Sequence, residues 1–331
     1  MISPATELDV LCLRPKADFE RAGVVPPSSL RIAYRGPDDS DAPALMKQAR
    51  ALVIPAVGPK IPCAFFDGTT VRFVQVTGAG LDRLDLGKLN ELGIAVANVP
   101  GGSNTALAEY AVAAASMLLR RFAWSDFEIR AGHYAAVRAR MLADNLSGLD
   151  ELTVGVVGLG AIGMAVAKAF HARGCHIGYY DPAPPDPDGA KALGAVALSL
   201  EQLLAKSDVI TLHVPLIPAT QNLIGADQFV LMKPTAILIQ ASRGGVVNES
   251  ALAGCLRLGH LGGAAVDVYS TEPPAADNPL LALDGEAARK LLLTPHIAGV
   301  TGQASTYLFR SAWRNVERVL IDKQPPVDRV A

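Results

Sequence analysis

Cysteine is scarce in this chain, and the few cysteines are far apart in sequence. Cys12, Cys63, Cys175 and Cys255 form no C-x-x-C pair. A disulfide framework and a cysteine-based zinc site both need clustered cysteines, so the spacing argues against both and fits a reducing compartment. No group of His, Asp and Glu has metal-ligand spacing either, so we expect no bound metal.

An excess of charge of one sign is also absent. The formal net charge is −2 over 331 residues, and there is no long basic run. Nucleic acids and anionic membranes attract clustered Lys and Arg, so we expect neither as a partner. The first ten residues carry Glu7 and Asp9 and no basic segment, unlike a signal peptide. We therefore expect a cytoplasmic protein.

Uninterrupted hydrophobic runs of membrane-spanning length are missing too. Residues 105–119 are rich in Ala and Leu, but Glu109 interrupts them and they are short for a bilayer. We interpret them as a buried helix. Half of the residues are hydrophobic, which allows a large core, and the length favours two domains.

The most informative segment that is present covers residues 153–181. An apolar strand at 153–157 precedes G-x-G-x-x-G at 158–163, then a helix and a second strand that ends at Asp181. The three glycines allow a tight turn, close approach of a pyrophosphate and close packing of the helix on the strand. The helix N-terminus attracts phosphates, and an acid at position 181 can hold the adenosine ribose. This context favours dinucleotide binding over a structural glycine turn.

Asp181 also bears on which dinucleotide is bound. A carboxylate repels the 2′-phosphate of NADP, and no Lys or Arg follows it until Lys191. We therefore predict NAD(H) as the cofactor.

Downstream of this segment, short apolar strands alternate with helices. The pattern predicts strands at 209–212, 236–240, 263–268 and 291–293, and a helix at 249–258. Near-continuous apolar strands alternating with helices are typical of a parallel sheet that is covered on both faces. We expect an α/β fold with a doubly wound parallel sheet of the Rossmann type.

The first hundred residues predict a second, smaller α/β unit without a dinucleotide motif. Strand candidates lie at 53–54, 73–76 and 94–97. A long helix at 105–121 would link the two units. The tail at 301–321 also has a helical pattern, and the pattern alone does not show against which unit it packs.

Three polar side chains at predicted strand ends form a chemically sensible set. Arg243 suits a carboxylate or a polarised carbonyl, His296 can exchange a proton near neutral pH, and Glu272 can orient that histidine. Taken singly, Arg243 fits a surface cation, His296 fits a structural histidine and Glu272 fits a residue of a solvated turn. Together at the carboxyl ends of one sheet, where ligands collect, they favour a site.

Beside a nicotinamide cofactor, this set predicts hydride transfer at a carbonyl or alcohol carbon. His296 would protonate the carbonyl oxygen and take the proton back in reverse, while Arg243 grips the neighbouring carboxylate. His213 also lies at a strand end, where the cofactor can touch its loop through the backbone.

Six segments make the chain similar to a known family, the D-isomer-specific 2-hydroxyacid dehydrogenases. Their order and spacing carry the resemblance over most of the chain. The matching segments are VGVVGLGAIG at 154–163, SDVITLHVPL at 207–216, ASRGGVVNESAL at 241–252, GAAVDVY at 263–269, EP at 272–273 and PHIAG at 295–299.

The resemblance implies the reaction and the residues that carry it. It implies an NAD-dependent D-2-hydroxyacid dehydrogenase, or 2-ketoacid reductase, with Arg243, Glu272 and His296 as the catalytic set. It places the substrate carboxylate at Gly78, Ala79 and Gly80, together with Arg243 and His296. It implies cofactor contacts at Gly158, Gly160, Ala161, Ile162, Gly163, Asp181, His213, Val214, Pro215, Ala241, Ser242, Arg243, Asp267, His296 and Gly299.

The resemblance also implies the domain organisation. A smaller flavodoxin-like substrate domain would comprise residues 1–104 and 299–331, and the NAD-binding domain would comprise 105–298. The family also implies a homodimer built on the cofactor domain.

Some features of the chain depart from the family pattern. Asn248 stands where Asp is usual, which affects a local cap, and residues 284–290 lengthen the approach to His296, where we expect an unusual loop. Residues 133–149 match poorly, in a region that selects substrate in some relatives. The 2-ketoacid therefore stays open, from glyoxylate, hydroxypyruvate and pyruvate to aryl and branched acids.

Other functions fit the same motifs less well. Phosphite oxidation occurs in the family, and a dinucleotide-sensing corepressor would keep the same site residues. Formate-oxidising relatives place Gln where this chain has Glu272, which argues against formate. A methyl transferase on the same kind of sheet fits the Arg243, Glu272 and His296 series poorly.

Overall fold

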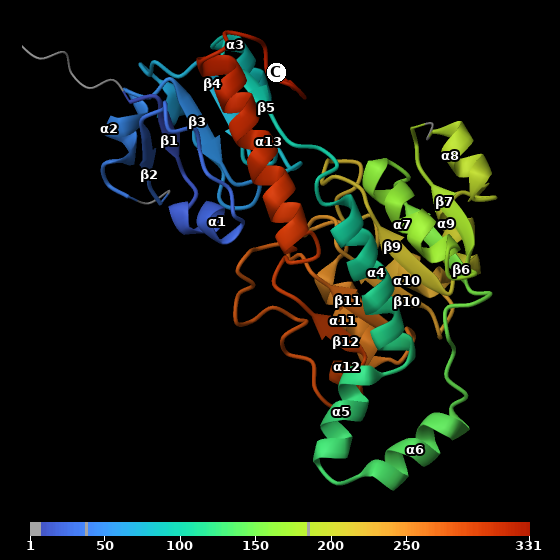
Figure 1. The fold of residues 1–331 in the computed structure, drawn as a ribbon. Coiled ribbons are helices and arrows are strands. Elements are labelled where there is room, and N and C mark those ends of the chain that lie inside the picture. Colours follow the sequence, from blue (N-terminus) through green and yellow to red (C-terminus); the bar gives the residue numbers. More distant parts are fainter. Residues whose placement is uncertain (1–7, 37–38, 184–185) are drawn as a thin grey trace, which may run out of the picture. The chain divides into compact units, whose positions relative to one another are not determined.

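The computed structural model describes residues 8–36, 39–183 and 186–331 (Figure 1). By its internal contacts the chain divides into two compact units, Met1–Ser103 with Val300–Ala331, and Asn104–Gly299. Each unit is built on one parallel sheet with helices around it. The predicted fold class, a Rossmann-type sheet plus a smaller α/β unit, is confirmed.

The first unit contains a five-stranded parallel sheet in the order β2-β1-β3-β4-β5. This is the flavodoxin-like strand order. Its strands are β1 (Val10–Cys12), β2 (Ile32–Tyr34), β3 (Ala51–Ile54), β4 (Phe73–Val76) and β5 (Ala95–Ala97). The sequence pattern did not predict β1 and β2, which have three residues each.

Helices cover this sheet, and one of them comes from the far end of the chain. Phe309 and Trp313 of that helix pack edge-on against Phe19, with ring centroids 4.9 and 5.4 Å apart. The C-terminal helix is therefore part of the core of the first unit. The helices are α1 (Lys16–Arg21), α2 (Ala42–Met46), a 3₁₀ turn η1 (Cys63–Phe66), α3 (Leu86–Glu91) and α13 (Gly302–Leu320).

The second unit contains a seven-stranded parallel sheet in the order β12-β11-β10-β9-β6-β7-β8. The chain starts in the middle at β6, moves outward to β8, and then returns to the other side of β6 at β9. Ligands of such sheets bind where the strand order reverses, here beyond β6 and β9. The strands are β6 (Thr153–Val157), β7 (His176–Tyr180), β8 (Val196–Ala197), β9 (Val209–Leu212), β10 (Ile237–Gln240), β11 (Gly263–Val266) and β12 (Leu291–Leu293).

Two hydrophobic layers enclose this sheet because its strands are apolar on both faces. Val156 and Ile239 point into one layer, with Phe170 of α7. Val157 and Leu238 point into the other, which contains residues of α9, α10 and α11. The helices are α4 (Asn104–Leu119), α5 (Phe122–Arg130), α6 (Tyr134–Ala143), α7 (Ala161–His171), α8 (Pro187–Ala192), α9 (Leu200–Lys206), α10 (Ala226–Leu231), α11 (Glu249–Arg257) and α12 (Gly285–Arg289).

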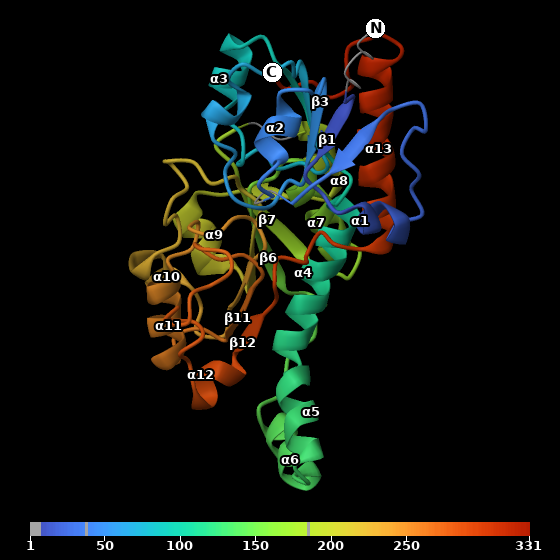
Figure 2. The same cartoon turned by 90° about the vertical axis from the view of Figure 1, so that its left-hand side faces the viewer.

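The helix predicted at 105–121 is shorter than expected. It ends at Leu119, because Arg121 adopts the left-handed conformation with φ of 50° and redirects the chain into α5. Helices α5 and α6 then form an arm that extends from the end of α4 (Figure 2). The guanidinium groups of Arg140 in α6 and Arg289 in α12 lie 5.4 and 6.0 Å from the ring centroid of Trp124 in α5. The contact with Arg289 joins the arm to α12.

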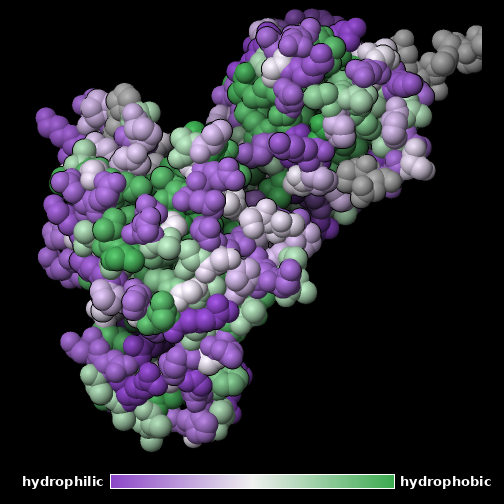
Figure 3. Space-filling view, turned by 180° about the vertical axis from the view of Figure 1, so that it is seen from behind, coloured by the Kyte–Doolittle hydropathy of each residue, from purple (hydrophilic) through white to green (hydrophobic). Residues whose placement is uncertain are grey.

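The arm exposes apolar side chains. Phe127, Tyr134 and Leu142 keep 66%, 61% and 65% of their surface accessible. Figure 3 shows hydrophobic and hydrophilic side chains mixed at this end of the molecule. In the described part of the chain, no helix is long and apolar enough to cross a membrane.

Residues 284–290, which lengthen the approach to His296, contain regular secondary structure. Residues Gly285–Arg289 form the short helix α12 and are not an irregular loop. Asn248 does act in a cap, because its side chain accepts the Ala251 N–H at the start of α11 at 2.9 Å.

Candidate active site

The glycine turn joins β6 to α7 and leaves no room for side chains at two positions. Gly158 has φ of +90°, and a Cβ there would lie 2.6 Å from the carbonyl oxygen of His213. A Cβ on Gly163 would lie 1.9 Å from the carbonyl oxygen of Gly158. Only glycine allows the turn to sit against β9 and the helix to sit against β6.

The N-terminus of α7 has the features of a phosphate cradle. No side chain caps it, and a Cβ on Gly160, its N-cap, would have no described atom within 4 Å. Ala161 and Ile162 follow in the first turn. Uncapped N–H groups that face open space, at the positive end of a helix dipole, fit a pyrophosphate. The residues present therefore fit the dinucleotide that the motif predicted.

Asp181 follows β7 and ties the end of that strand to the glycine turn. One carboxylate oxygen accepts the Leu159 N–H at 2.7 Å and the other accepts the Ala183 N–H at 2.9 Å. A carboxylate has about four acceptor positions, so two backbone donors leave capacity for ribose hydroxyls.

The segment after β9 contacts the other side of the glycine turn. The Nε2 atom of His213 lies 2.8 Å from the Thr211 hydroxyl, and its buried Nδ1 atom has no partner among the described residues. Burial lowers the pKa of His213 to about 4, so the ring is neutral. The His213 carbonyl and the Val214 side chain lie against the glycine turn, where both would meet a Cβ on Gly158. Pro215 is the next residue of this segment.

A buried amide shapes the segment after β10. Gln240 is 2% exposed; its Nε2 donates to the Arg243 carbonyl and its Oε1 accepts the Ser242 hydroxyl, both at 2.8 Å. The Arg243 guanidinium donates to the Ser242 carbonyl at 2.7 Å. Ala241 packs with Ile162 in a small apolar cluster. Gln240 was not among the predicted site residues, although a polar residue at the end of an apolar strand was a possible signal.

His296 and Glu272 are in direct contact. The His296 Nδ1 and Glu272 Oε2 atoms lie 2.8 Å apart, and the side chains are 25% and 28% exposed. A carboxylate only accepts, so Nδ1 carries the hydrogen and Nε2 is the atom left to exchange a proton. His296 has φ of 55°, an uncommon conformation for a non-glycine residue, which marks a locally constrained segment.

Asp267 shapes the segment that carries His296. The side chain is 1% exposed and accepts the Thr294 hydroxyl at 2.6 Å and the N–H groups of Ile297 and Ala298 at 2.8 Å. The Thr294 hydroxyl lies 2.7 Å from the Tyr110 hydroxyl on α4. The resemblance implied only a cofactor contact for Asp267, whereas its contacts show that it determines the backbone path around His296.

The predicted substrate loop lies in the first unit, directly after β4. The Gly78 carbonyl accepts the Val99 N–H at 2.9 Å, and the Ala79 carbonyl accepts the Asn98 side-chain amide at 2.8 Å. Within the described ranges, the N–H groups of residues 78–80 donate to no protein acceptor. Fixed carbonyls and available N–H groups fit a bound carboxylate.

The predicted residues therefore fall into three groups. Glu272 and His296 touch each other; Gly158, Asp181, His213 and Val214 surround the glycine turn; and Gly78, Ala79 and Gly80 lie in the first unit. Arg243 follows β10, which pairs with β11, and Gly299 ends the second unit. Among the residues described, no group of three or more His, Cys, Asp or Glu has a geometry suited to a metal ion.

Comparison with known proteins identifies relatives with named activities. The D-3-phosphoglycerate dehydrogenase of Archaeoglobus fulgidus is 38% identical over 234 residues, which cover 71% of this chain and 42% of that protein. The chain thus matches less than half of that relative's length. The (S)-sulfolactate dehydrogenase of Chromohalobacter salexigens is 37% identical over 249 residues, 75% of this chain and 76% of that protein.

A solved structure is similar over nearly the whole chain. The holo form of Rhodotorula graminis D-mandelate dehydrogenase superposes with a TM-score of 0.84 at 27% identity, covering 99% of this chain and 98% of that chain. The family model for the NAD-binding domain of D-isomer-specific 2-hydroxyacid dehydrogenases matches residues 112–298, more than half of the sequence. The predicted family and the NAD cofactor are confirmed: the chain belongs to the D-isomer-specific 2-hydroxyacid dehydrogenases, a family of NAD-dependent oxidoreductases.

Proposed function

We propose that this protein interconverts a 2-ketoacid and a D-2-hydroxyacid, with His296 as the acid and base. The observation that carries the proposal is the contact of 2.8 Å between His296 and Glu272, in the unit that holds the glycine turn. Bound NAD(H) supplies or accepts the hydride. During reduction, His296 Nε2 delivers a proton to the carbonyl oxygen, so that carbon gains the hydride and oxygen gains the proton.

Glu272 and Arg243 have supporting roles in this proposal. Glu272 holds the Nδ1–H of His296, which fixes the ring orientation and stabilises the charged imidazolium that must form before proton delivery. Arg243 binds the substrate carboxylate through its planar guanidinium. The Gln240 amide keeps the Arg243 backbone in place.

We assign the two units to different tasks. Asn104–Gly299 would bind NAD through Gly158, Gly160, Gly163 and Asp181, and the unit of Met1–Ser103 with Val300–Ala331 would bind the substrate through residues 78–80. The N–H groups of that loop support the assignment, since they have no protein acceptor among the described residues. These boundaries differ by one residue from those that the resemblance implied.

We further propose a homodimer and a cytoplasmic location. The apolar side chains that the arm exposes, Phe127 among them, supply a surface for a second copy. The four unpaired cysteines fit a reducing compartment.

The test is NADH oxidation with a panel of 2-ketoacids and NAD reduction with a panel of 2-hydroxyacids. The relatives' names place D-mandelate, (S)-sulfolactate and D-3-phosphoglycerate in the second panel. The first panel contains glyoxylate, pyruvate and hydroxypyruvate, which the family resemblance left open. Arg243→Ala should lower kcat/KM by about 10- to 100-fold, because a charged hydrogen bond to the carboxylate is lost.

The variant Arg173→Ala is a matched control, since Arg173 lies beyond α7 and its guanidinium bonds to the Ala169 carbonyl. It should keep wild-type kinetics. Absence of turnover on every acid, with NADH still bound, would refute the proposal. Phosphite oxidation and dinucleotide sensing gain no support from the relatives above, which are all named as dehydrogenases of hydroxyacids.

A further inference from the structure

The segment that carries Glu272 has little regular structure of its own. Residues 270–278 follow β11 and contain no helix or strand. Of these residues, Ser270–Glu272 are exposed, whereas Asn278 is 8% exposed. A segment of this kind keeps one conformation only if other parts of the protein hold it.

One carboxylate binds both ends of this segment. Glu249, the first residue of α11, accepts the Ser270 N–H with Oε1 and the Asn278 side-chain amide with Oε2, both at 2.6 Å. The two oxygens of a single side chain therefore close residues 270–278 into a loop. Asn278 is itself fixed, because its Oδ1 accepts the Leu280 N–H at 3.0 Å.

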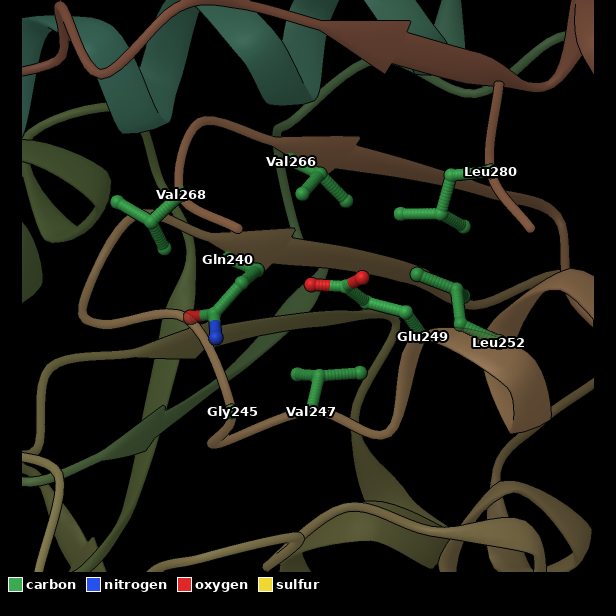
Figure 4. A pocket seen from close by; sticks show the side chains of 8 residues that line it. All are labelled: Gln240, Gly245, Val247, Glu249, Leu252, Val266, Val268 and Leu280. Carbon is green, nitrogen blue, oxygen red and sulfur yellow. The ribbon is translucent and has the colours of Figure 1, made fainter. Parts of the chain in front are cut away.

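Apolar side chains and the Gln240 amide line the surroundings of this carboxylate. Figure 4 shows Glu249 pointing between Val247 and Val266, with Leu252 and Leu280 alongside. The described lining residues leave no room for a water molecule between them. Glu249 is partly exposed, and each of its two carboxylate oxygens has a protein donor. Hydrogen bonds to a charged group are stronger than those between neutral groups, so the loss of one oxygen weakens the attachment of the loop.

The loop end that Glu249 holds lies next to the proposed catalytic pair. Ser270 is preceded by Tyr269, whose N–H donates to Glu272 Oε1 at 3.1 Å. The other oxygen of Glu272 faces His296 Nδ1 at 2.8 Å. A shift of the backbone at Ser270 would therefore move both contacts of Glu272.

We propose that Glu249 is a positioning residue, which clamps the loop of residues 270–278 so that Glu272 keeps His296 in the reactive orientation. The proposal rests on the proposed function for its kinetic consequence, and on the two hydrogen bonds of Glu249 for its structural one. Glu249 does not touch His296, so it acts through Glu272.

The experiment compares Glu249→Gln with the wild type, with Asn278→Ala and with the control Glu201→Gln. Glutamine has an NH2 donor in place of one of the two accepting oxygens, so the variant should lower kcat by about 10- to 100-fold through misplacement of Glu272, while the Kd for NADH stays within about twofold. Asn278→Ala removes one of the two bonds and should give a smaller loss. Glu201→Gln removes the acidic residue from the first turn of α9 and should leave kcat unchanged.

A double-mutant cycle separates positioning from a general loss of stability. If Glu249 acts through Glu272, then adding Glu249→Gln to Glu272→Gln should change kcat by less than about twofold. Two effects that multiply would overturn the proposal. The pH dependence of kcat in Glu249→Gln should also change toward that of Glu272→Gln.

Hydrogen exchange gives a readout that does not depend on turnover. Peptides covering residues 270–278 should exchange faster in Glu249→Gln and Asn278→Ala than in wild type and Glu201→Gln. Unchanged exchange would overturn the clamp even if activity fell. If wild type reduces no ketoacid while exchange responds as expected, the proposed function fails and the clamp stands.

Discussion

Two histidines at strand ends of the same sheet have opposite surroundings. His213 has a buried Nδ1 without a partner among the described residues, and its pKa is lowered to about 4 by burial. His296 is 25% exposed and presents Nδ1 to a carboxylate. The contact of His296 with a carboxylate is the arrangement that the proposed proton transfer needs, and His213 lacks it, although both histidines follow apolar strands in the sequence.

The surroundings of His213 predict acid sensitivity of the fold. The unfolded chain protonates this residue below its ordinary pKa of 6.5, whereas the folded chain does so only near 4. The stability contribution is therefore complete above about pH 6.5 and is lost as the pH falls toward 4. In His213→Gln, the free energy of unfolding should depend less steeply on pH in this window, by up to roughly 1.4 kcal/mol per pH unit.

Denaturant unfolding at several pH values measures this slope. Above pH 7 the slopes of wild type and variant should coincide. Equal slopes between pH 6.5 and 4 would show that the histidine does not titrate as its burial implies.

At the scale of elements, two glycines of the turn between β6 and α7 have different roles: Gly163 is needed for packing and Gly160 is expected to be needed for cofactor binding. Gly163 leaves no space because the backbone of Gly158 lies against it, whereas Gly160 faces open space. Both glycines belong to the same motif in the sequence, which does not distinguish the two roles.

Alanine at the two positions should therefore give different outcomes. Gly163→Ala should lower the free energy of unfolding by about 1–3 kcal/mol, because the Cβ forces α7 away from β6. Gly160→Ala should leave the stability of the protein without cofactor almost unchanged and raise the Kd for NADH, because the Cβ occupies the phosphate cradle. Thermal unfolding without NADH and fluorescence titration with NADH measure the two effects.

A Gly163→Ala protein with unchanged stability, or a Gly160→Ala protein with wild-type NADH affinity, would contradict these separate roles of the two glycines.

The loop of residues 270–278 is a second feature at the scale of elements. Glu249, a residue outside the loop, accepts hydrogen bonds from both of its ends.

At the scale of the whole molecule, segments from distant parts of the sequence complete each unit. Helix α13 completes the core of the first unit. In the second unit, the arm of α5 and α6 is held to α12 through the ion pair of Glu128 with Arg289, at 3.0 Å. The arm has few apolar contacts of its own, since neither α5 nor α6 has more than one buried residue.

The exposed side chains of the arm predict its role in assembly. Wild-type protein should elute with twice the mass of the 34.6 kDa chain, and Phe127→Glu should shift it toward the monomer, because a charge in an apolar interface costs desolvation energy. Val25→Glu is the control: Val25 is 87% exposed and belongs to the first unit, so it should leave the mass unchanged. Light scattering coupled to size exclusion measures both, and a monomeric wild type would refute the dimer.

The sequence by itself determined the features that depend on neighbours along the chain. The glycine motif, the apolar strands and the residue types after β7, β10, β11 and β12 predicted the Rossmann-type sheet, the NAD cofactor and the candidate residues Arg243, Glu272 and His296. The pattern predicted the three-residue strands β5 and β12 but not β1 and β2, which have the same length, so strand length does not explain the difference.

Only the tertiary structure decided which partner each buried polar atom uses. Glu249 meets Asn278, and Asp267 meets the N–H groups after His296, across 29 to 31 positions of sequence. Hydrogen-bond partners of this kind depend on how separate loops pack at the edge of the sheet, and residue type alone does not encode that packing. The break of the long helix at Arg121 and the place of α13 were likewise decided by the fold as a whole.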